Sequence, residues 1–289
     1  MARFYDKLIV DIPETDDLYN ELKSTTVISG DEVAKYYIDL SKNQGIDFRK
    51  DIPVMSPPFD NFFVDISGIK SIDYRGFGVL FKAWTPNNWD MEEYNKWIDN
   101  SSLPIGFKNK LPKWIMLASL FIEARSESVG HWLVGLDNDG QIEKRNDNDF
   151  YIFSPSRDIP IDFYFKNDDF FNTILGISFM TISFMHCKNI TIKEILPPEK
   201  VNRKRVKNNK KPLVRYHVLN IEPMKTVLKR VGNIESNGFK KAIHICRGHF
   251  KNYQGAGLFG KHKGLYWWDM HLRGNKEEGL INKDYKVSI

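Results

Sequence analysis

Cysteine is scarce in this chain of 289 residues, which contains only Cys187 and Cys246. So few cysteines exclude a disulfide scaffold, and without a Cys-x-x-Cys pair a zinc knuckle is not expected. The first residues turn acidic after a short apolar run, so the sequence shows no long hydrophobic region typical of a signal peptide. We therefore expect a cytoplasmic protein.

Long hydrophobic runs are also rare. The most apolar stretch, residues 170–187, is near the lower length limit for a membrane span and contains several Ser, Thr and Asn residues. We interpret it as a helix buried in the core, which begins at the N-cap sequence Asn167-Asp168-Asp169. We expect no membrane partner.

Several catalytic motifs are absent: the sequence has no HExxH, no Walker A loop, no GxSxG, and no kinase or EF-hand pattern. Residues 255–260 read GAGLFG and match the dinucleotide pattern GxGxxG in form. The preceding strand, following helix and distant acid that such a site needs are not visible, so we assign these glycines to tight turns. We predict no metal and no cofactor.

The residues that are abundant indicate a folded core. The chain is 42% hydrophobic and 13% aromatic, which suits one large domain or two smaller ones. The patterning predicts an α+β fold: a mainly antiparallel sheet, a few buried helices and a β-rich basic C-terminal segment. Predicted helices cover residues 29–41, 168–187 and 224–230. Predicted strands cover residues 62–67, 76–84, 131–136, 141–143, 150–154, 161–165, 189–196 and 214–221, with a hairpin turn at 137–140, and residues 113–123 fit a buried strand or helix.

Composition also suggests a division of the chain. Residues 232–238 form a mostly polar linker, and the residues after it are dense in glycine and aromatic side chains. We therefore assign residues 1–231 to a main domain, a candidate for recognition of a host protein, and residues 232–289 to a β-rich basic and aromatic C-terminal segment.

Positive charge is concentrated in two places, although the net charge is only +5. Residues 199–211 contain seven Lys or Arg and one acid, and residues 240–276 contain eight Lys or Arg and one acid. We interpret the first cluster as an exposed basic loop between prolines and the second as a charged face. The alternative for both is an ordinary solvated surface.

Basic, histidine and aromatic residues are interleaved between Ile243 and Gly274, where Asp269 is the only acid. This composition suits nucleic acid, because cations neutralise phosphates and aromatic rings stack on bases. The candidate nucleic-acid-binding residues are Arg203, Lys204, Arg205, Arg247, His249, Lys261, Lys263, Tyr266, Trp268 and Arg273.

Four of the seven histidines lie in this segment: His244, His249, His262 and His271. If two of them converge, they could act as general base and general acid of a metal-independent RNase. Otherwise they bond backbone groups within a small β unit. Convergence is a matter of geometry, so both interpretations stay open.

Residues 197–221 read PPEKVNRKRVKNNKKPLVRYHVLNI and are followed by IHICRGHFKNY, GLFGKHKG and YWWDMHLRG. These motifs, together with PPFDNFFVDIS at residues 57–67, resemble a family of proteins from phages and other mobile elements that includes a type V-A anti-CRISPR protein. The resemblance implies counter-defence in a bacterial host. The activity it implies is loss of the messenger RNA of the CRISPR effector during translation, after the nascent effector chain is recognised. The matching positions, carried over as candidate binding residues, are Arg203, Arg205, His217, His244, Arg247, Gly248, His249 and Arg273.

The sequence therefore predicts a phage or mobile-element protein that binds RNA or a ribonucleoprotein through its last third. We favour a non-enzymatic function. Two alternatives remain: the histidine RNase, and a protein-binding or structural phage module that makes no contact with nucleic acid.

Overall fold

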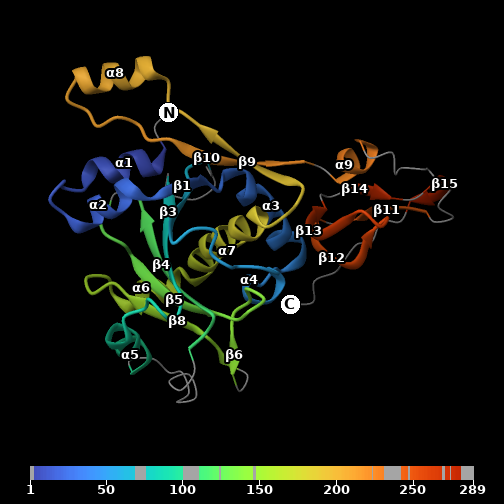
Figure 1. The fold of residues 1–289 in the computed structure, drawn as a ribbon, viewed down its shortest axis with the longest axis horizontal. Helices are drawn as coiled ribbons and strands as arrows, with labels where there is room; N and C mark the ends of the chain where they lie inside the picture. Colours follow the sequence, from blue (N-terminus) through green and yellow to red (C-terminus); the bar gives the residue numbers. More distant parts are fainter. Residues whose placement is uncertain are drawn as a thin grey trace. The chain divides into compact units, whose positions relative to one another are not determined.

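The computed structural model describes residues 3–68, 76–99, 111–123, 125–145, 148–222, 224–230, 242–246, 248–268, 271–273 and 275–280. They belong to two units (Figure 1). Unit 1 comprises Met1–Met185 and Ile192–Leu219, and unit 2 comprises His186–Thr191 and Asn220–Ile289. The boundary predicted between residues 231 and 232 lies outside the described residues.

The largest element is an eight-stranded sheet with the strand order β8-β5-β4-β3-β2-β1-β10-β9. The neighbours from β2 to β8 pair antiparallel, whereas β1 pairs parallel with both β2 and β10. The sheet is therefore mixed but mainly antiparallel, and the predicted α+β fold is confirmed. Its strands are β1 (Thr26–Ser29), β2 (Asn61–Ile66), β3 (Phe77–Trp84), β4 (Trp114–Ile122), β5 (Gly130–Leu136), β8 (Tyr151–Pro155), β9 (Ile190–Ile195) and β10 (Tyr216–Ile221).

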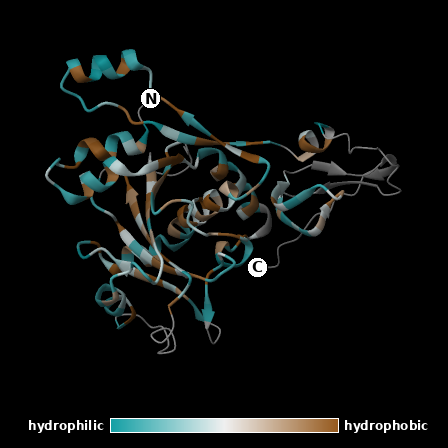
Figure 2. Ribbon diagram, viewed as in Figure 1, coloured by the Kyte–Doolittle hydropathy of each residue, from teal (hydrophilic) through white to brown (hydrophobic). Residues whose placement is uncertain are grey.

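One face of this sheet is covered by α3 (Asp31–Gln44), α4 (Phe48–Asp51) and α7 (Asp168–Met185) (Figure 1). In α7, the ring of Phe179 packs against Phe81 of β3 and Phe48 of α4, with ring centroids 5.6 and 5.4 Å apart. Most of α7 is buried, and Figure 2 shows its hydrophobic character. The predicted core helix is confirmed, and among the described residues no helix is both long and apolar enough to cross a bilayer.

The opposite face is covered at two places. At one, α1 (Phe4–Asp11) and α2 (Asp17–Ser24) pack on Phe63, Leu80 and Phe121. At the other, α5 (Met91–Asp99) packs on Ile115 and Leu133. The strand register puts Ser119 and His131 on this same face, between the two covered places.

A buried carboxylate fixes the start of α1. Oδ2 of Asp65 accepts the Tyr5 amide hydrogen at 2.7 Å, and Oδ1 accepts the Ser67 hydroxyl, whose oxygen accepts the Phe4 amide hydrogen at 2.7 Å. Two N–H groups of the first helical turn thus find partners supplied by β2 and the residue after it. Burial raises the pKa of the Asp65 carboxyl to about 6.

Several sequence predictions need correction. Residues 161–165, predicted as a strand, lie in α6 (Ile161–Lys166), because Pro160 stands at the N-cap and Asp162 in the first turn. Residues 113–123 are a strand, β4. The turn at 137–140 is confirmed, with Gly140 at φ +76°, but residues 141–143 contribute only the bridge between Ile142 and Leu136, since β5 pairs with β4 and β8 instead. The small strands β6 (Lys144–Arg145) and β7 (Asn148–Asp149) follow.

Unit 2 contains α9 (Met224–Arg230), the hairpin of β12 (His249–Leu258) and β13 (His262–Trp268), and a sheet in which β11 (Ala242–Cys246) lies between β14 (His271–Arg273) and β15 (Asn275–Leu280). Asn189 holds the hairpin in place. Its Nδ2 donates to the carbonyl oxygens of Glu222 and Trp267, both at 2.8 Å, and its Oδ1 accepts the Trp267 amide hydrogen at 2.9 Å. Beside it, the Lys188 amide donates to the Leu265 carbonyl at 2.8 Å.

Candidate nucleic-acid interface

The β12–β13 hairpin carries five of the candidate residues, namely His249, Lys261, Lys263, Tyr266 and Trp268. Its tip is a two-residue turn: Phe259 and Gly260 have φ of +52° and +68°, and the Lys261 amide donates to the Leu258 carbonyl at 3.2 Å. Positive φ at both central residues is the type I′ geometry, which favours Asn and Gly because larger side chains are strained there. Phe259 occupies the first of these positions.

Phe259 is 56% exposed, so its ring gains little from burial in the folded chain. A bulky residue held in a strained backbone conformation, without packing to explain it, points to a role outside the fold. Phe259 is not among the binding residues predicted from the sequence, because Phe-Gly is not a dipeptide that signals a type I′ turn.

Two exposed cations lie at this turn: Lys261 is its last residue, and Lys263 is the second residue of β13. Lys251 is also exposed, but it pairs with Tyr266 farther along the hairpin, and its ammonium lies 5.0 Å from the centroid of the Tyr253 ring. At the other end of the hairpin, the exposed His249 ring lies parallel to the Trp268 ring at 6.5 Å between centroids.

The predicted stacking pair of Tyr266 and Trp268 is only partly available. Tyr266 is 6% exposed, because Met224 and Leu228 of α9 pack on it. Its ring therefore belongs to the core of unit 2 and not to an open platform. Trp268 is partly exposed, and Trp267, on the other side of β13, is buried.

The described histidines do not converge. His249 pairs with Trp268, and His262 lies six residues from Trp268 along β13, a distance of about 20 Å at 3.3 Å per residue. The backbone register places His244 opposite Arg273 and His271 opposite Cys246. The side chains of His244, His271 and Arg273, and the whole of Arg247, lie outside the described residues.

Most of the second basic cluster forms a helix, so the loop predicted between the prolines is wrong for residues 199–207, while residues 208–212 lie outside any helix or strand. α8 (Glu199–Lys207) follows Pro197 and Pro198, with Glu199 in its first turn and Lys204, Arg205 and Lys207 in its last turn. This charge order complements the helix dipole, and the long straight side chains favour helix. Asn202 bonds the helix to the segment before β10, since its amide both donates to and accepts from the backbone of Leu213 at 3.0 and 2.8 Å.

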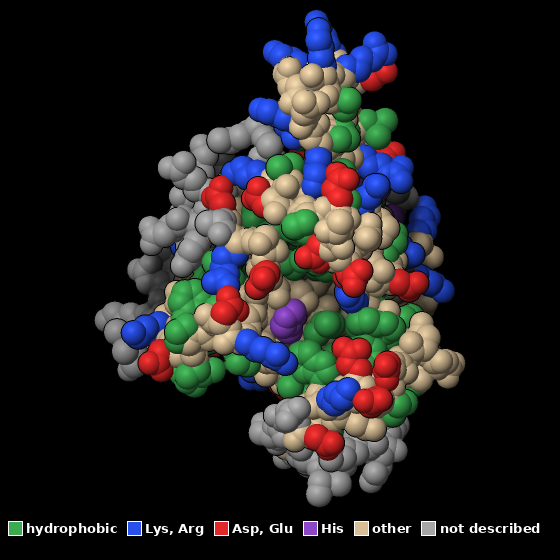
Figure 3. All heavy atoms as spheres, turned by 90° about the vertical axis from the view of Figure 1, so that its left-hand side faces the viewer, with side chains coloured by type: hydrophobic (Ala, Val, Ile, Leu, Met, Phe, Trp, Pro, Cys, Tyr) green, Lys and Arg blue, Asp and Glu red, His purple; other side chains and the backbone are tan. Residues whose placement is uncertain are grey.

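Part of the positive charge at residues 199–211 is used within the fold. The Arg203 guanidinium lies 2.5 Å from the Glu199 carboxylate, and Arg205 donates to the Lys211 carbonyl at 2.8 Å. Lys211 donates to the carbonyl oxygens of Ile9 and Ile12 at 3.0 and 3.2 Å. Lys204 remains exposed, and Figure 3 shows Lys and Arg side chains gathered over α8.

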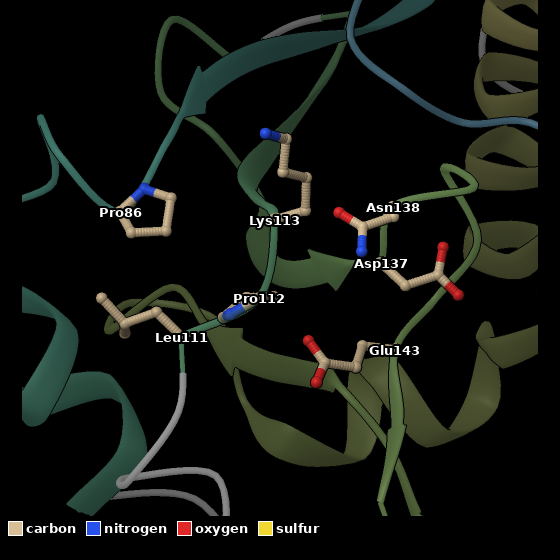
Figure 4. A pocket seen from close by; sticks show the side chains of 7 residues that line it. All are labelled: Pro86, Leu111, Pro112, Lys113, Asp137, Asn138 and Glu143. Atoms are coloured by element: carbon tan, nitrogen blue, oxygen red, sulfur yellow. The ribbon is translucent and has the colours of Figure 1, made fainter.

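A separate pocket of about 280 Å³ lies at the edge of unit 1 (Figure 4). In Figure 4 the Asp137 carboxylate points away from the other labelled side chains, and it accepts the amide hydrogens of Asp139 and Gln141 at 2.9 Å each. This carboxylate therefore stabilises the turn. The lining residues, which include none of the predicted site residues, are Pro86, Leu111, Pro112, Lys113, Asp137, Asn138 and Glu143.

Within the described part of the chain, no group of three or more His, Cys, Asp or Glu side chains is arranged to hold a metal ion. Comparisons of the chain with protein-family models, with curated proteins and with solved structures found no match.

Proposed function

We propose that the protein binds RNA, alone or in a ribonucleoprotein, through the β12–β13 hairpin. The observation that carries the proposal is the solvent-exposed ring of Phe259 at a strained turn, followed closely by the exposed Lys261 and Lys263. An exposed ring provides a surface on which an unpaired base stacks, and the lysines neutralise the phosphates on either side of that base. The recognition would tolerate many sequences, because every base has a π face.

The other parts of the hairpin have roles in the same proposal. His249 and Trp268 offer a second partly exposed aromatic surface, and Lys251 adds charge. Tyr266 and Trp267 are buried, so they stabilise the fold of the hairpin. α8 is an additional phosphate contact through Lys204, whereas Arg205 contributes less because its guanidinium is bonded to the backbone.

The RNase alternative receives less support, since His249 and His262 are at opposite ends of the hairpin. The resemblance to phage and mobile-element proteins supplies the biological setting: counter-defence in a bacterial cytoplasm, in which unit 1 recognises a host protein and RNA binding leads to loss of a message. That setting is part of the proposal and is tested separately, by capture of protein and RNA from infected cells.

The experiment compares Phe259→Asn with wild type in binding of a fluorescent single-stranded RNA. Asn fits the type I′ turn, so we expect the variant to be as stable as wild type or about 1 kcal/mol more stable. Loss of one stacked base costs about 1–3 kcal/mol, so affinity should fall about 5- to 150-fold. Lys261→Ala with Lys263→Ala should reduce the slope of log affinity against log salt by about one to two.

The matched control is Lys193→Ala, which removes an exposed lysine from β9 and should leave the affinity and its salt dependence unchanged. Equal affinity of the Phe259→Asn variant and wild type would refute the stacking role. Binding that does not weaken as salt increases would refute the phosphate contacts and favour a protein-binding module.

A further inference from the structure

A cluster of polar side chains lies on a part of the main sheet that no helix of the described residues covers. Lys82 of β3, Ser119 of β4 and His131 of β5 share the face on which α1, α2 and α5 pack, at positions between these helices. Figure 3 shows this side of unit 1, where the surface is hollowed and a histidine side chain is visible within the hollow. Lys82 and His131 are partly exposed, whereas Ser119 is buried, so the cluster joins a buried hydroxyl to side chains that solvent can reach.

Both nitrogens of His131 are engaged by serine hydroxyls. Nδ1 lies 2.8 Å from Oγ of Ser119, which is 7% exposed, and Nε2 lies 2.9 Å from Oγ of Ser128, which is partly exposed. The buried serine is placed to orient the ring, and the accessible serine is placed to react. This is the arrangement of a nucleophile, a base and an orienting group.

The loop that carries Ser128 is held firmly. The Ser156 hydroxyl donates to the Ser128 carbonyl at 2.6 Å, and the Tyr164 hydroxyl donates to the carbonyl of Val129. The Val129 amide in turn donates to the Leu120 carbonyl at 2.7 Å. Ser128 is therefore fixed relative to the strand that carries His131, as a reacting group must be.

Charged groups lie near His131 on this face. The Lys82 ammonium lies 2.7 Å from Oε2 of Glu21, on α2, while Oε1 of Glu21 is buried and has no hydrogen-bond partner among the described residues. Burial, and next the positive charge of Lys82, lower the pKa of His131, which keeps the imidazole neutral. A neutral imidazole is the form that accepts a proton.

We propose that Ser128 and His131 form a catalytic dyad that hydrolyses acyl esters, with Ser119 as the positioning residue. Nδ1–H of His131 donates to Ser119, so the lone pair of Nε2 faces the Ser128 hydroxyl. The Ser128 oxygen bonds to the ester carbonyl carbon while its proton moves to Nε2. The bond to the leaving alkoxide breaks, Nε2 returns the proton to that alkoxide, and water repeats the sequence on the acyl-serine to release the acid.

The group that orients His131 is a serine and not a carboxylate, so we expect ester hydrolysis to be slow. A carboxylate stabilises the imidazolium that forms after proton transfer, and a neutral hydroxyl does so less. We therefore expect slow turnover of an activated ester such as p-nitrophenyl acetate. Covalent labelling by a fluorophosphonate is the more sensitive measurement, because the serine oxygen displaces fluoride in a single step.

The test measures the rate of fluorophosphonate labelling of the full chain and locates the label by peptide mass spectrometry. We expect label on Ser128, none in Ser128→Ala, and a rate lower by at least about 100-fold in His131→Gln, which keeps a polar group but cannot take the proton. Ser126→Ala, an exposed serine of the same loop, should label like wild type.

The labelling rate of wild type should also fall at acidic pH as His131 becomes protonated, with Lys82 facing it and Glu21 and Glu93 facing Lys82. Ser119→Ala should slow labelling and shift this pH profile, because Nδ1 loses the partner that fixes the tautomer. Thermal unfolding of each variant separates loss of reactivity from loss of the fold. Absence of label on Ser128 of folded wild type, or equal labelling of the Ser128→Ala variant, overturns the proposal.

Discussion

Asn189 offers the sharpest test of how unit 2 is held together. Its side chain is 3% exposed and bonds three backbone groups: the carbonyls of Glu222 and Trp267 and the amide of Trp267. Asn189→Ala leaves the buried carbonyl and amide of Trp267 and the part-buried carbonyl of Glu222 without these partners. Each buried unsatisfied group costs about 1–3 kcal/mol, so the two groups of Trp267 alone should cost the variant roughly 2–6 kcal/mol, a large part of the stability of a small unit.

The assay is hydrogen exchange followed by mass spectrometry. Peptides from β13 should lose protection in the Asn189→Ala variant, whereas peptides from β3 and β4 of unit 1 should keep theirs. Asn252→Ala, an exposed asparagine on β12, is the matched control and should exchange like wild type. A loss below about 1 kcal/mol, or equal deprotection of both units, would contradict the assignment of Asn189 as the anchor of the hairpin.

Two further predictions concern unit 1. Because the folded-state pKa of Asp65 is raised above its ordinary value of 3.8 to about 6, the folded chain holds the proton between these values and the unfolded chain does not. The unfolding free energy of wild type should therefore fall as pH rises through that window. Asp65→Asn should gain stability relative to wild type by up to about 3 kcal/mol between pH 4 and pH 7, measured by urea unfolding at each pH. A difference between the two proteins that stays constant with pH would refute the prediction. Lys211→Met removes the two hydrogen bonds to the carbonyls of Ile9 and Ile12 and the cation that lies 4.3 Å from the Tyr19 ring centroid. Thermal unfolding should therefore show that the variant loses about 1–3 kcal/mol of stability. Lys210→Met, at an exposed neighbouring position, is the control and should lose none.

The pattern of apolar residues along the sequence predicted the elements that pack in the core. The strands β2 and β3 and the helix α7 were recognised because their apolar residues face a core on one or both sides. Residues 161–166 were misassigned because Phe163 and Tyr164 resemble strand residues, yet they pack on Phe171 as part of a helix. Aromatic content alone does not separate the two, since tertiary contacts override propensity.

The candidate site was predicted by composition but not by geometry. Tyr266 and Trp268 were both predicted to bind nucleic acid, but the sequence could not show that α9 covers Tyr266. Phe259 was overlooked because the strain at its position is a backbone property. His131 was overlooked because Ser119 and Ser128 come from different parts of the chain, and only the strand register brings Ser119 to it.

Charge counted along the sequence overestimates the charge that a segment offers to a partner. Of the seven cations in residues 199–211, Arg203 is paired with Glu199, and Arg205 and Lys211 are bonded to backbone carbonyls. Backbone carbonyls carry only partial charge, so these cations still contribute to the field of the protein, but the donors that they use there are not available for phosphate. Lys200, Lys204, Lys207 and Lys210 stay exposed, as Lys261 and Lys263 do in the hairpin. What distinguishes the hairpin as a contact for nucleic acid is the exposed Phe259 ring beside its lysines.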